Sequence, residues 1–273
     1  MKPLPKQETV DIGIVGAGIH GAALARELTL RGVRCALLDR GAVGGGTSQW
    51  STQLLHGGIR YLRTGDVRQM REGLRERATW VRLAPWRCRW EAFWMPHRTR
   101  WQGIQHRIGI GLYDWWGRAR PEWPASLRLG PVDRHAFARD PRSHGGPFRG
   151  ATAFADLMTW DRDLTSDLAA SSEASIFDLH EIVEWEPRHE GGRAELSVAH
   201  LLDHRTGERR TVRAALWVFA LGPWLDEAMA KWFGDRARVL RLSAGLHLWF
   251  DLPPGMERPW AAMRTPTRII FAI

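Results

Sequence analysis

Near the N-terminus, two short apolar runs flank a longer stretch with helical spacing. Residues 11–15 (DIGIV) and 36–38 (ALL) are mostly apolar, and residues 19–31 repeat apolar positions every three to four residues. Short apolar runs predict buried strands, whereas the three-to-four spacing predicts an amphipathic helix. This order predicts a strand, a helix and a second strand that runs parallel to the first.

The same two patterns recur along the rest of the chain. Residues 216–220 (LWVFA) are continuously apolar, which is typical of a strand inside a parallel sheet. Strands that alternate with helices predict an α/β fold class. Helices are predicted at 66–83, 102–116, 163–174 and 224–233, and strands at 175–187, 194–218, 239–251 and 268–273.

A glycine-rich turn, residues 16–21 (GAGIHG), joins the first strand to the helix and matches the G-x-G-x-x-G dinucleotide fingerprint. Gly16 permits a tight turn, Gly18 lets a pyrophosphate approach the backbone, and Gly21 lets the helix pack close to the strand. The N–H groups of Ile19 and His20 lie at the positive end of the helix dipole, so they are expected to face the phosphates.

The second strand ends at Asp39, where an acid receives hydrogen bonds from the adenosine ribose. An acid here argues against a 2′-phosphate and hence against NADP; Arg40 follows it and is assigned to the same site. Residues 41–48 (GAVGGGTS) are expected to lie along the cofactor, with Thr47 and Ser48 as hydrogen-bond donors. An ordinary strand–turn–helix is the alternative, which the acid in its expected place disfavours.

Composition narrows the class of protein. The chain has 273 residues and a net charge of +9, carried almost wholly by arginine. Such an excess fits nucleic acid, an anionic membrane surface or an anionic substrate, but without a nucleic-acid-binding motif we expect no nucleic-acid partner. The two cysteines predict neither a disulfide framework nor a metal site. The polar N-terminus and the lack of a long apolar run predict a cytoplasmic protein without a spanning helix.

Residues 84–150 differ from their surroundings, because tryptophans alternate there with arginines and prolines. One interpretation is a tryptophan-rich core in which arginines stack on the rings. The other is an interfacial surface, since tryptophan and arginine favour the lipid headgroup layer. The pattern leaves both open.

Residues 51–62 (STQLLHGGIRYL) resemble the flavin-dependent glycerol-3-phosphate dehydrogenases, within the wider D-amino-acid-oxidase-like group. The HGG-x-RYL segment and the GPW turn at 222–224 together make the resemblance specific. It extends over essentially the whole chain, through Leu83-Ala84-Pro85, Met95-Pro96-His97, Gly111-Leu112-Tyr113-Asp114 and Gly245-Leu246-His247.

The resemblance implies noncovalently bound FAD and hydride transfer from C2 of sn-glycerol 3-phosphate to the flavin, which gives dihydroxyacetone phosphate. It implies that a quinone receives the electrons, and hence a peripheral location on the inner face of the cytoplasmic membrane. It also implies a Rossmann-like FAD-binding domain, expected at 1–83 and 151–237. A smaller antiparallel-sheet substrate domain, expected at 84–150 and 238–273, is interleaved with it.

Oxidation of a secondary alcohol needs a base beside the hydroxyl, and His56 and His247 are the candidates. Arg60 supplies a forked cation for a phosphate, and Tyr61 adds a hydroxyl. Cofactor contacts are also expected from Ser51, Gly57, Gly58 and Gly222.

Departures from the family's pattern bear on the substrate. Gln53 and Ala244 stand where lysine is usual, and His20 is an unusual residue in the fingerprint. The chain ends at Ile273 within an apolar run, where the resemblance implies further flavin- and substrate-binding segments, so we expect a C-terminally truncated member. The alternatives are a divergent flavin oxidoreductase acting on another hydroxy or amino substrate, and an inactive fragment.

Overall fold

The chain forms two compact units, each built from segments that are distant in the sequence. Unit 1 comprises Met1–Thr52 and Asp161–His247, and unit 2 comprises Gln53–Trp160 and Leu248–Ile273. The computed structural model describes residues 4–59, 61, 65–117, 130–140, 143–144, 147–190, 193–234, 238–248, 251, 254, 260–263 and 269–272.

Unit 1 contains a six-stranded sheet in the order β7-β2-β1-β10-β9-β8. The strands from β7 to β10 are parallel, whereas β9 and β8 continue the sheet in antiparallel fashion. The strands are β1 (Gln7–Val15), β2 (Cys35–Leu38), β7 (Ser175–Phe177), β8 (His180–Glu190), β9 (Arg193–Asp203) and β10 (Arg209–Phe219).

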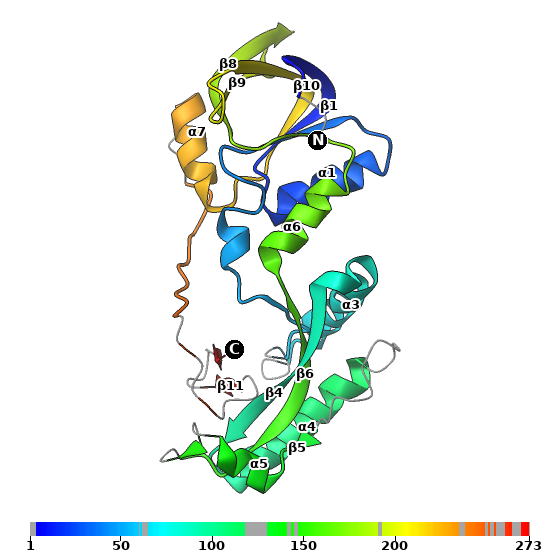
Figure 1. Cartoon of the computed structure of the whole chain (residues 1–273), viewed down its shortest axis with the longest axis vertical. Coiled ribbons are helices and arrows are strands. Elements are labelled where there is room, and N and C mark those ends of the chain that lie inside the picture. The colour runs from blue at the N-terminus through cyan, green and yellow to red at the C-terminus, as the bar shows by residue number, and fades with distance from the viewer. Residues whose placement is uncertain are drawn as a thin grey trace. The chain divides into compact units, whose positions relative to one another are not determined.

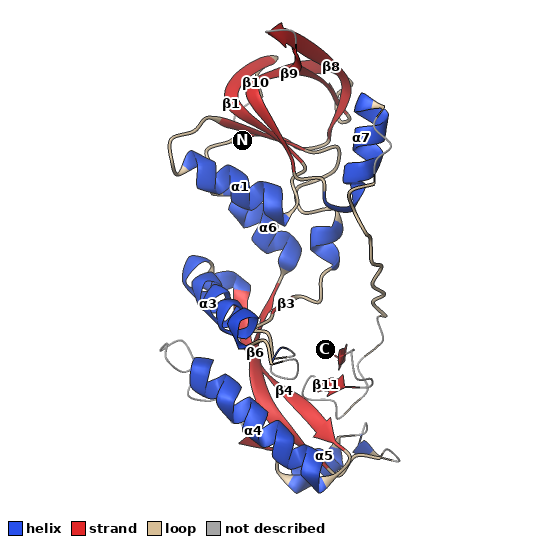
Figure 2. Ribbon diagram, turned by 180° about the vertical axis from the view of Figure 1, so that it is seen from behind, coloured by secondary structure: helices blue, strands red, loops and turns tan. Residues whose placement is uncertain are grey.

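Helices α1 (Ile19–Thr29) and α6 (Asp161–Ala170) of unit 1 lie side by side in Figures 1 and 2. Short 3-10 turns η1 (Thr47–Trp50) and η4 (Gly222–Trp224) complete the loops, and α7 (Leu225–Phe233) follows η4. The core is formed mainly by β-strand side chains, including the fully buried Leu38, Phe177, Leu201 and Val212. The predicted strand–helix–strand and its parallel pairing are confirmed.

Unit 2 is built on a second sheet, in the order β12-β11-β4-β6-β3, with β5 paired to β6. Its strands are β3 (Leu54–Leu55), β4 (Cys88–His97), β5 (Gly130–Pro131), β6 (Gly150–Thr159), β11 (Trp260–Met263) and β12 (Ile269–Ala272). Its helices are α3 (Val67–Leu83), α4 (Arg100–Gly117) and α5 (Arg134–Arg139), with the turn η2 (Pro85–Arg87) before β4.

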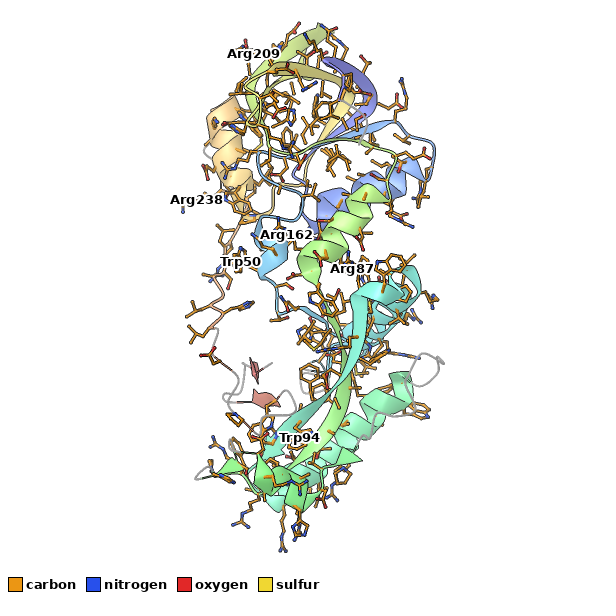
Figure 3. All side chains as sticks on the ribbon, in the orientation of Figure 1. Trp50, Arg87, Trp94, Arg162, Arg209 and Arg238 are labelled. Carbon is orange, nitrogen blue, oxygen red and sulfur yellow. The ribbon has the colours of Figure 1, made fainter. Side chains whose placement is uncertain are left out.

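The antiparallel pair β4–β6 forms the centre of unit 2, with Cys88 opposite Thr159 and His97 opposite Gly150. Phe93 and Phe154 are fully buried and stack with ring centroids 5.7 Å apart. Trp94, labelled in Figure 3, lies on β4 and contacts Phe137 of α5 at 6.2 Å between ring centroids.

Most predicted helices and strands are confirmed within a few residues, but the sequence patterns failed at β4, β6 and 239–248. Neither β4 nor β6 was predicted. Residues 239–248 were predicted as a strand and form neither helix nor strand. A strand needs a neighbour for its backbone groups; here the N–H groups of Val239 and Leu240 donate instead to the Asp226 carboxylate.

The compact units also begin and end at residues other than the expected domain boundaries. Residues 53–83 and 151–160 belong to unit 2, and 238–247 belong to unit 1. The reason is the sheet of unit 2: β3 pairs with β6, and β6 pairs with β4 along its full length, so the ladder ties these segments together.

Candidate functional site

The glycine turn of unit 1 has the conformation that the fingerprint requires. Gly16 has a φ of +109°, and its N–H donates to the Leu38 carbonyl at 2.7 Å. A Cβ at Gly16 would collide with the Ala220 backbone at the end of β10, and a Cβ at Gly21 would overlap the Gly16 carbonyl oxygen. Both glycines are therefore needed for the close approach of α1, β1 and β10.

The N-terminus of α1 forms a cradle of backbone donors. The Ser48 hydroxyl accepts a hydrogen bond from the Ile19 N–H at 2.9 Å. Around Gly18, the atom that a Cβ would meet is this same Ser48 Oγ, at 3.1 Å. His20 is exposed on the first turn. An open Gly18 beside helix N–H groups and a hydroxyl fits a pyrophosphate.

Asp39 closes the cradle at the end of β2. Its Oδ2 accepts from the Ala17 N–H at 2.7 Å and its Oδ1 from the Gly41 N–H at 2.8 Å. Each carboxylate oxygen has two lone pairs, so capacity for ribose hydroxyls is left. Burial raises the pKa of Asp39, and the two backbone donors only partly offset it. Arg40 is exposed.

The loop 41–48 is held against the rest of unit 1. The Gly44 N–H donates to the Ala17 carbonyl at 2.9 Å, and a Cβ at Gly44 would stand 3.2 Å from Thr165 of α6. Thr47 is exposed, and the Ser51 N–H donates to the Asp161 carboxylate at 3.0 Å. The loop thus presents Ser48, rather than Thr47, to the helix N-terminus.

Two further predicted residues lie in unit 1. Gly222 opens η4 with a φ of +53°, and a Cβ there would meet open space, so the backbone conformation alone explains this glycine. His247 is exposed at the end of the unit, in a segment without regular structure. Their contacts with a cofactor or substrate stay predictions.

In unit 2, His56 lies beside a buried carboxylate that was not among the predicted site residues. His56 Nδ1 lies 3.3 Å from Asp156 Oδ2, and the Gly57 N–H donates to Asp156 Oδ1 at 3.2 Å. The Asp156 side chain is 1% exposed, whereas that of His56 is 37% exposed. A buried acid on β6 thus orients a ring that reaches the surface.

Arg77 of α3 completes this cluster. Its Nη1 donates to Asp156 Oδ1 at 3.0 Å and to the Tyr113 hydroxyl at 2.9 Å, and its side chain is 3% exposed. The guanidinium also lies over the Trp90 ring, 4.8 Å from the centroid. We call Asp156, Arg77, His56 and Tyr113 the carboxylate cluster.

Neighbouring groups decide the protonation of Asp156 within the cluster. Burial raises the pKa of Asp156, but the hydrogen bond from His56 and the charge of Arg77 outweigh it, so the pKa lies below its ordinary value. An ionised carboxylate only accepts hydrogen bonds. His56 therefore donates from Nδ1, and Nε2 carries the lone pair in the neutral ring.

The glycines after His56 have a packing role. A Cβ at Gly57 would collide with the Tyr113 hydroxyl and stand 2.8 Å from Arg77 Nη1, and Gly58 has a φ of +82°. Tyr61 packs on the cluster of Met70, Leu74 and Tyr113. Arg60 lies outside the described residues. Flavin contacts for the two glycines and a phosphate contact for Tyr61 remain predictions.

The sequence did carry a signal for both missed residues. Arg77 falls on the apolar side of its helix, seven residues after the fully buried Met70 and three after Leu74. Asp156 is a single acid within the apolar run 151–158 (ATAFADLM). A charge in a position whose neighbours are all buried indicates a buried ion pair.

Comparison with known proteins assigns the chain to a family. The profile of the family described as "FAD dependent oxidoreductase" matches residues 11–273. The chain belongs to this family. FAD is accordingly the cofactor of this oxidoreductase, and the cradle at Gly18, Ser48 and Asp39 fits the pyrophosphate and ribose of that group.

Two curated relatives of the oxidoreductase bear the same name. The aerobic glycerol-3-phosphate dehydrogenase of Staphylococcus aureus strain MRSA252 is 26% identical over 273 residues, which is 98% of this chain and 48% of the relative. The same figures hold for the protein of strain USA300. The chain thus spans about half the length of the curated relatives that it matches.

Solved structures share the fold of the oxidoreductase. The glycerol-3-phosphate dehydrogenase from Bacillus halodurans complexed with FAD matches with a TM-score of 0.56 and 20% identity, over 82% of this chain and 36% of that one. L-amino acid deaminase from Proteus vulgaris matches with a TM-score of 0.54 and 15% identity, over 84% of this chain and 50% of that one.

Proposed function

We propose that this oxidoreductase converts sn-glycerol 3-phosphate to dihydroxyacetone phosphate and passes the electrons to a quinone at a membrane. The name shared by the curated relatives and the HGG-x-RYL segment at 56–62 support this substrate. The proposal concerns the activity of the whole protein.

The observation that carries the proposal is the pair of His56 and Asp156. Removing a hydride from a secondary alcohol requires that the hydroxyl proton go to a base. His56 Nδ1 lies 3.3 Å from the buried Asp156 carboxylate, and the imidazole ring is partly exposed. Such a base gains positive charge when it takes the proton, and Asp156 stabilises that charge.

FAD, when bound, supplies the hydride acceptor. The residues of this chain do the rest: His56 Nε2 takes the hydroxyl proton, and Asp156 keeps the ring in its tautomer and orientation. Arg77 keeps Asp156 ionised, because its guanidinium lies 3.0 Å from Oδ1 in a buried setting. Arg60 and Tyr61 are assigned to the substrate phosphate, a role that suits a forked cation and a phenol.

The test uses the purified whole protein loaded with FAD. Anaerobic addition of sn-glycerol 3-phosphate is expected to bleach the flavin absorbance, and an artificial electron acceptor should then allow turnover. His56→Gln should slow flavin reduction by about 10²- to 10⁴-fold, the usual contribution of a general base, with FAD affinity unchanged.

His247→Gln provides the matched comparison, because His247 is the rival candidate base. We expect its rate of flavin reduction to stay within about twofold of the native rate, well below the effect of losing a general base. A loss in His247→Gln with native behaviour in His56→Gln would transfer the role to His247. No bleaching in a FAD-loaded protein would refute glycerol 3-phosphate as the substrate.

A second candidate is oxidation of another hydroxy or amino substrate. Gln53, where the family usually has lysine, favours it, and Gln53 is held in the left-handed region with a φ of +55°. The same bleaching assay with glycine, L-proline and 2-hydroxy acids distinguishes the candidates. Bleaching by one of these and not by glycerol 3-phosphate would establish the second.

A further inference from the structure

Two histidines meet where helix α4 (Arg100–Gly117) packs on the β4–β6 pair. His97 is the last residue of β4, and His106 lies in the second turn of α4. Their ring centroids are 6.3 Å apart, and the rings are nearly perpendicular, at 87°. Both side chains are partly buried. We call these two residues the histidine pair.

Helix α4 is held on the sheet by one of its faces (Figure 2); neither it nor any other helix among the described residues is long and apolar enough to cross a membrane. Its inward residues recur every three or four positions and so share a face; they are Gly103, His106, Ile110 and Tyr113. A Cβ at Gly103 would stand 2.8 Å from His97 Nε2, so the His97 ring lies directly against the backbone of α4. The histidine pair is therefore part of the surface that holds α4 to the sheet.

The histidine pair has no counter-charge. Nδ1 of each ring is buried and forms no hydrogen bond, and no carboxylate of the described residues forms an ion pair with either ring. On the sheet face that His97 occupies, the acids are Glu91 and Asp156, each about 20 Å away along the strands. On α4 the first acid is Asp114, about 12 Å along the axis from His106. Strand β5 contributes no titratable group.

The charges around the pair are positive. Four exposed arginines lie on α4 or next to the ends of β4 and β6: Arg98, Arg100, Arg107 and Arg149. Protonation of either ring places a further cation in this setting, beside a second imidazole. A cation that is shielded from water and has no partner is costly.

Both rings are held against protonation. Burial lowers the pKa of His97, and the charge of Arg107 lowers it further. Burial also lowers the pKa of His106, His97 adds to the shift, and the Met95 backbone offsets it in part. Histidines with lowered pKa values contribute stability that is present above the unfolded value of about 6.5 and is lost as the pH falls through the folded values. Acid therefore weakens the packing of α4 on the sheet.

We propose that the histidine pair is an acid-sensitive switch that controls the carboxylate cluster through α4. With both rings neutral, α4 stays on the β4–β6 pair and the Tyr113 hydroxyl accepts from Arg77 at 2.9 Å. Tyr113 follows His106 by seven residues, so the two share the inward face about 10 Å apart along the axis. Protonation of the pair parts α4 from the sheet, and Arg77 loses its Tyr113 partner. His56 and Asp156 then lose the arrangement that the base needs.

The switch rests on the proposed function in one respect, since its effect on catalysis assumes that His56 is the base. Two measurements on the whole protein loaded with FAD keep the packing and the catalysis apart. Hydrogen exchange of peptides from 100–117, corrected for the intrinsic pH dependence of exchange, reports on α4. The rate of flavin reduction by sn-glycerol 3-phosphate reports on the cluster.

In the native protein, protection of α4 should fall by at least about tenfold between pH 7.5 and pH 5.5, because linkage allows up to about tenfold per pH unit for each proton. His97→Asn/His106→Gln removes both titrating rings, so its protection should change by less than about twofold. Each single variant should respond to an intermediate extent, which keeps the test decisive where the double variant does not fold. His135→Gln is the matched control, because His135 is an exposed histidine of α5 in unit 2, and its response should be native.

Flavin reduction tests the link from α4 to the cluster. Loss of a single base lets the rate fall by at most about tenfold per pH unit. The native rate should fall more steeply than this below about pH 6.5, whereas the rate of His97→Asn/His106→Gln should follow the slope of a single base. Tyr113→Phe should keep the exchange response of α4 and lose the extra steepness, because the hydroxyl that joins α4 to Arg77 is gone.

Unchanged protection of α4 between pH 7.5 and pH 5.5 in the native protein would overturn the switch, as would an equal fall in His97→Asn/His106→Gln. An exchange response in α4 together with the slope of a single base in the native rate would overturn its control of the cluster. Absence of flavin bleaching with the exchange response intact would refute the proposed substrate and leave the acid-sensitive packing of α4 standing.

Discussion

The candidate sites of the two units each contain a carboxylate that is at least partly buried, and the two carboxylates differ in what neutralises them. Asp39 of unit 1 accepts two backbone N–H bonds, and burial raises its pKa. Asp156 of unit 2 faces His56 and Arg77, and its pKa is lowered although it is the more deeply buried. Burial alone therefore does not set the direction of the pKa shift, because a cation within hydrogen-bond distance can outweigh it.

The difference extends to how each site is built. The cradle of unit 1 uses backbone groups of a short continuous segment, so glycine spacing suffices to form it. The carboxylate cluster of unit 2 joins side chains of α3, α4 and β6 to His56, which is 100 residues from Asp156 in the chain. A buried network of this kind depends on all of its members.

Among the substitutions that test this comparison, removal of Asp156 should have the largest effect on stability. Asp156→Ala leaves the Arg77 guanidinium buried without its counter-charge, which is expected to lower the free energy of unfolding of unit 2 by about 3–5 kcal/mol. Hydrogen exchange of peptides from 88–97 and 150–159 reports on unit 2 alone. Native protection there after the substitution would contradict a stabilising role for the ion pair.

The double variant Arg77→Met/Asp156→Leu sharpens the same test. Replacing both members of a buried ion pair by apolar residues is often neutral. We expect it to recover most of the protection lost in Asp156→Ala while flavin reduction stays slow, because the Asp156 carboxylate beside His56 Nδ1 is lost. Recovery of the rate together with the fold would show that Asp156 does not act through His56.

A smaller effect is expected in the cradle of unit 1. Gly21→Ala would push a methyl group into the Gly16 carbonyl, and such overpacking costs about 1–3 kcal/mol. FAD affinity, measured by quenching of flavin fluorescence, should fall because α1 moves away from β1. The matched control is Gly111→Ala, since a Cβ there meets no atom and alanine favours a helix by about 0.5–1 kcal/mol. Equal FAD affinity in both variants would show that the cradle does not bind the cofactor.

Lowering the pH should change the contributions of the two carboxylates to stability in opposite directions, with a smaller effect than the substitutions above. The lowered pKa of Asp156 contributes stability that is present above its unfolded value of about 3.9 and is lost as the pH falls through the folded pKa. The raised pKa of Asp39 acts in the opposite sense: its contribution is complete below the unfolded value and is lost as the pH rises through the folded pKa.

Urea unfolding between pH 7 and pH 2 tests this difference. The native chain should lose stability below about pH 4 more steeply than Arg77→Met/Asp156→Leu, by at most about 1.4 kcal/mol per pH unit for one group. The Asp39→Asn variant should show no such flattening of the acid limb. Parallel curves for the native chain and the double variant would mean that Asp156 does not have a lowered pKa.

What could be predicted from the sequence also differs between the two units. The fingerprint predicted the β1–α1–β2 unit, its parallel pairing and the position of Asp39, because these depend on local spacing and on the missing side chains of Gly16 and Gly21. The resemblance of residues 51–62 indicated His56, with His247 as the rival base. The sequence patterns did not predict β4, which contains Pro96 and a mixture of tryptophan and arginine, and the strand predicted over 239–248 is absent.

The sequence by itself thus determined the dinucleotide turn, the helix register and the family resemblance, each of which is carried by short local motifs. Tertiary structure alone decided which charges meet. Arg77 reaches Asp156 only because β6 pairs with β4 and α3 packs against α4, and the charge of Arg77 helps to hold the pKa of Asp156 below its ordinary value. Electrostatic energy in a buried site depends on distances between atoms and on the exclusion of water, and neither can be read from the order of residues in the sequence.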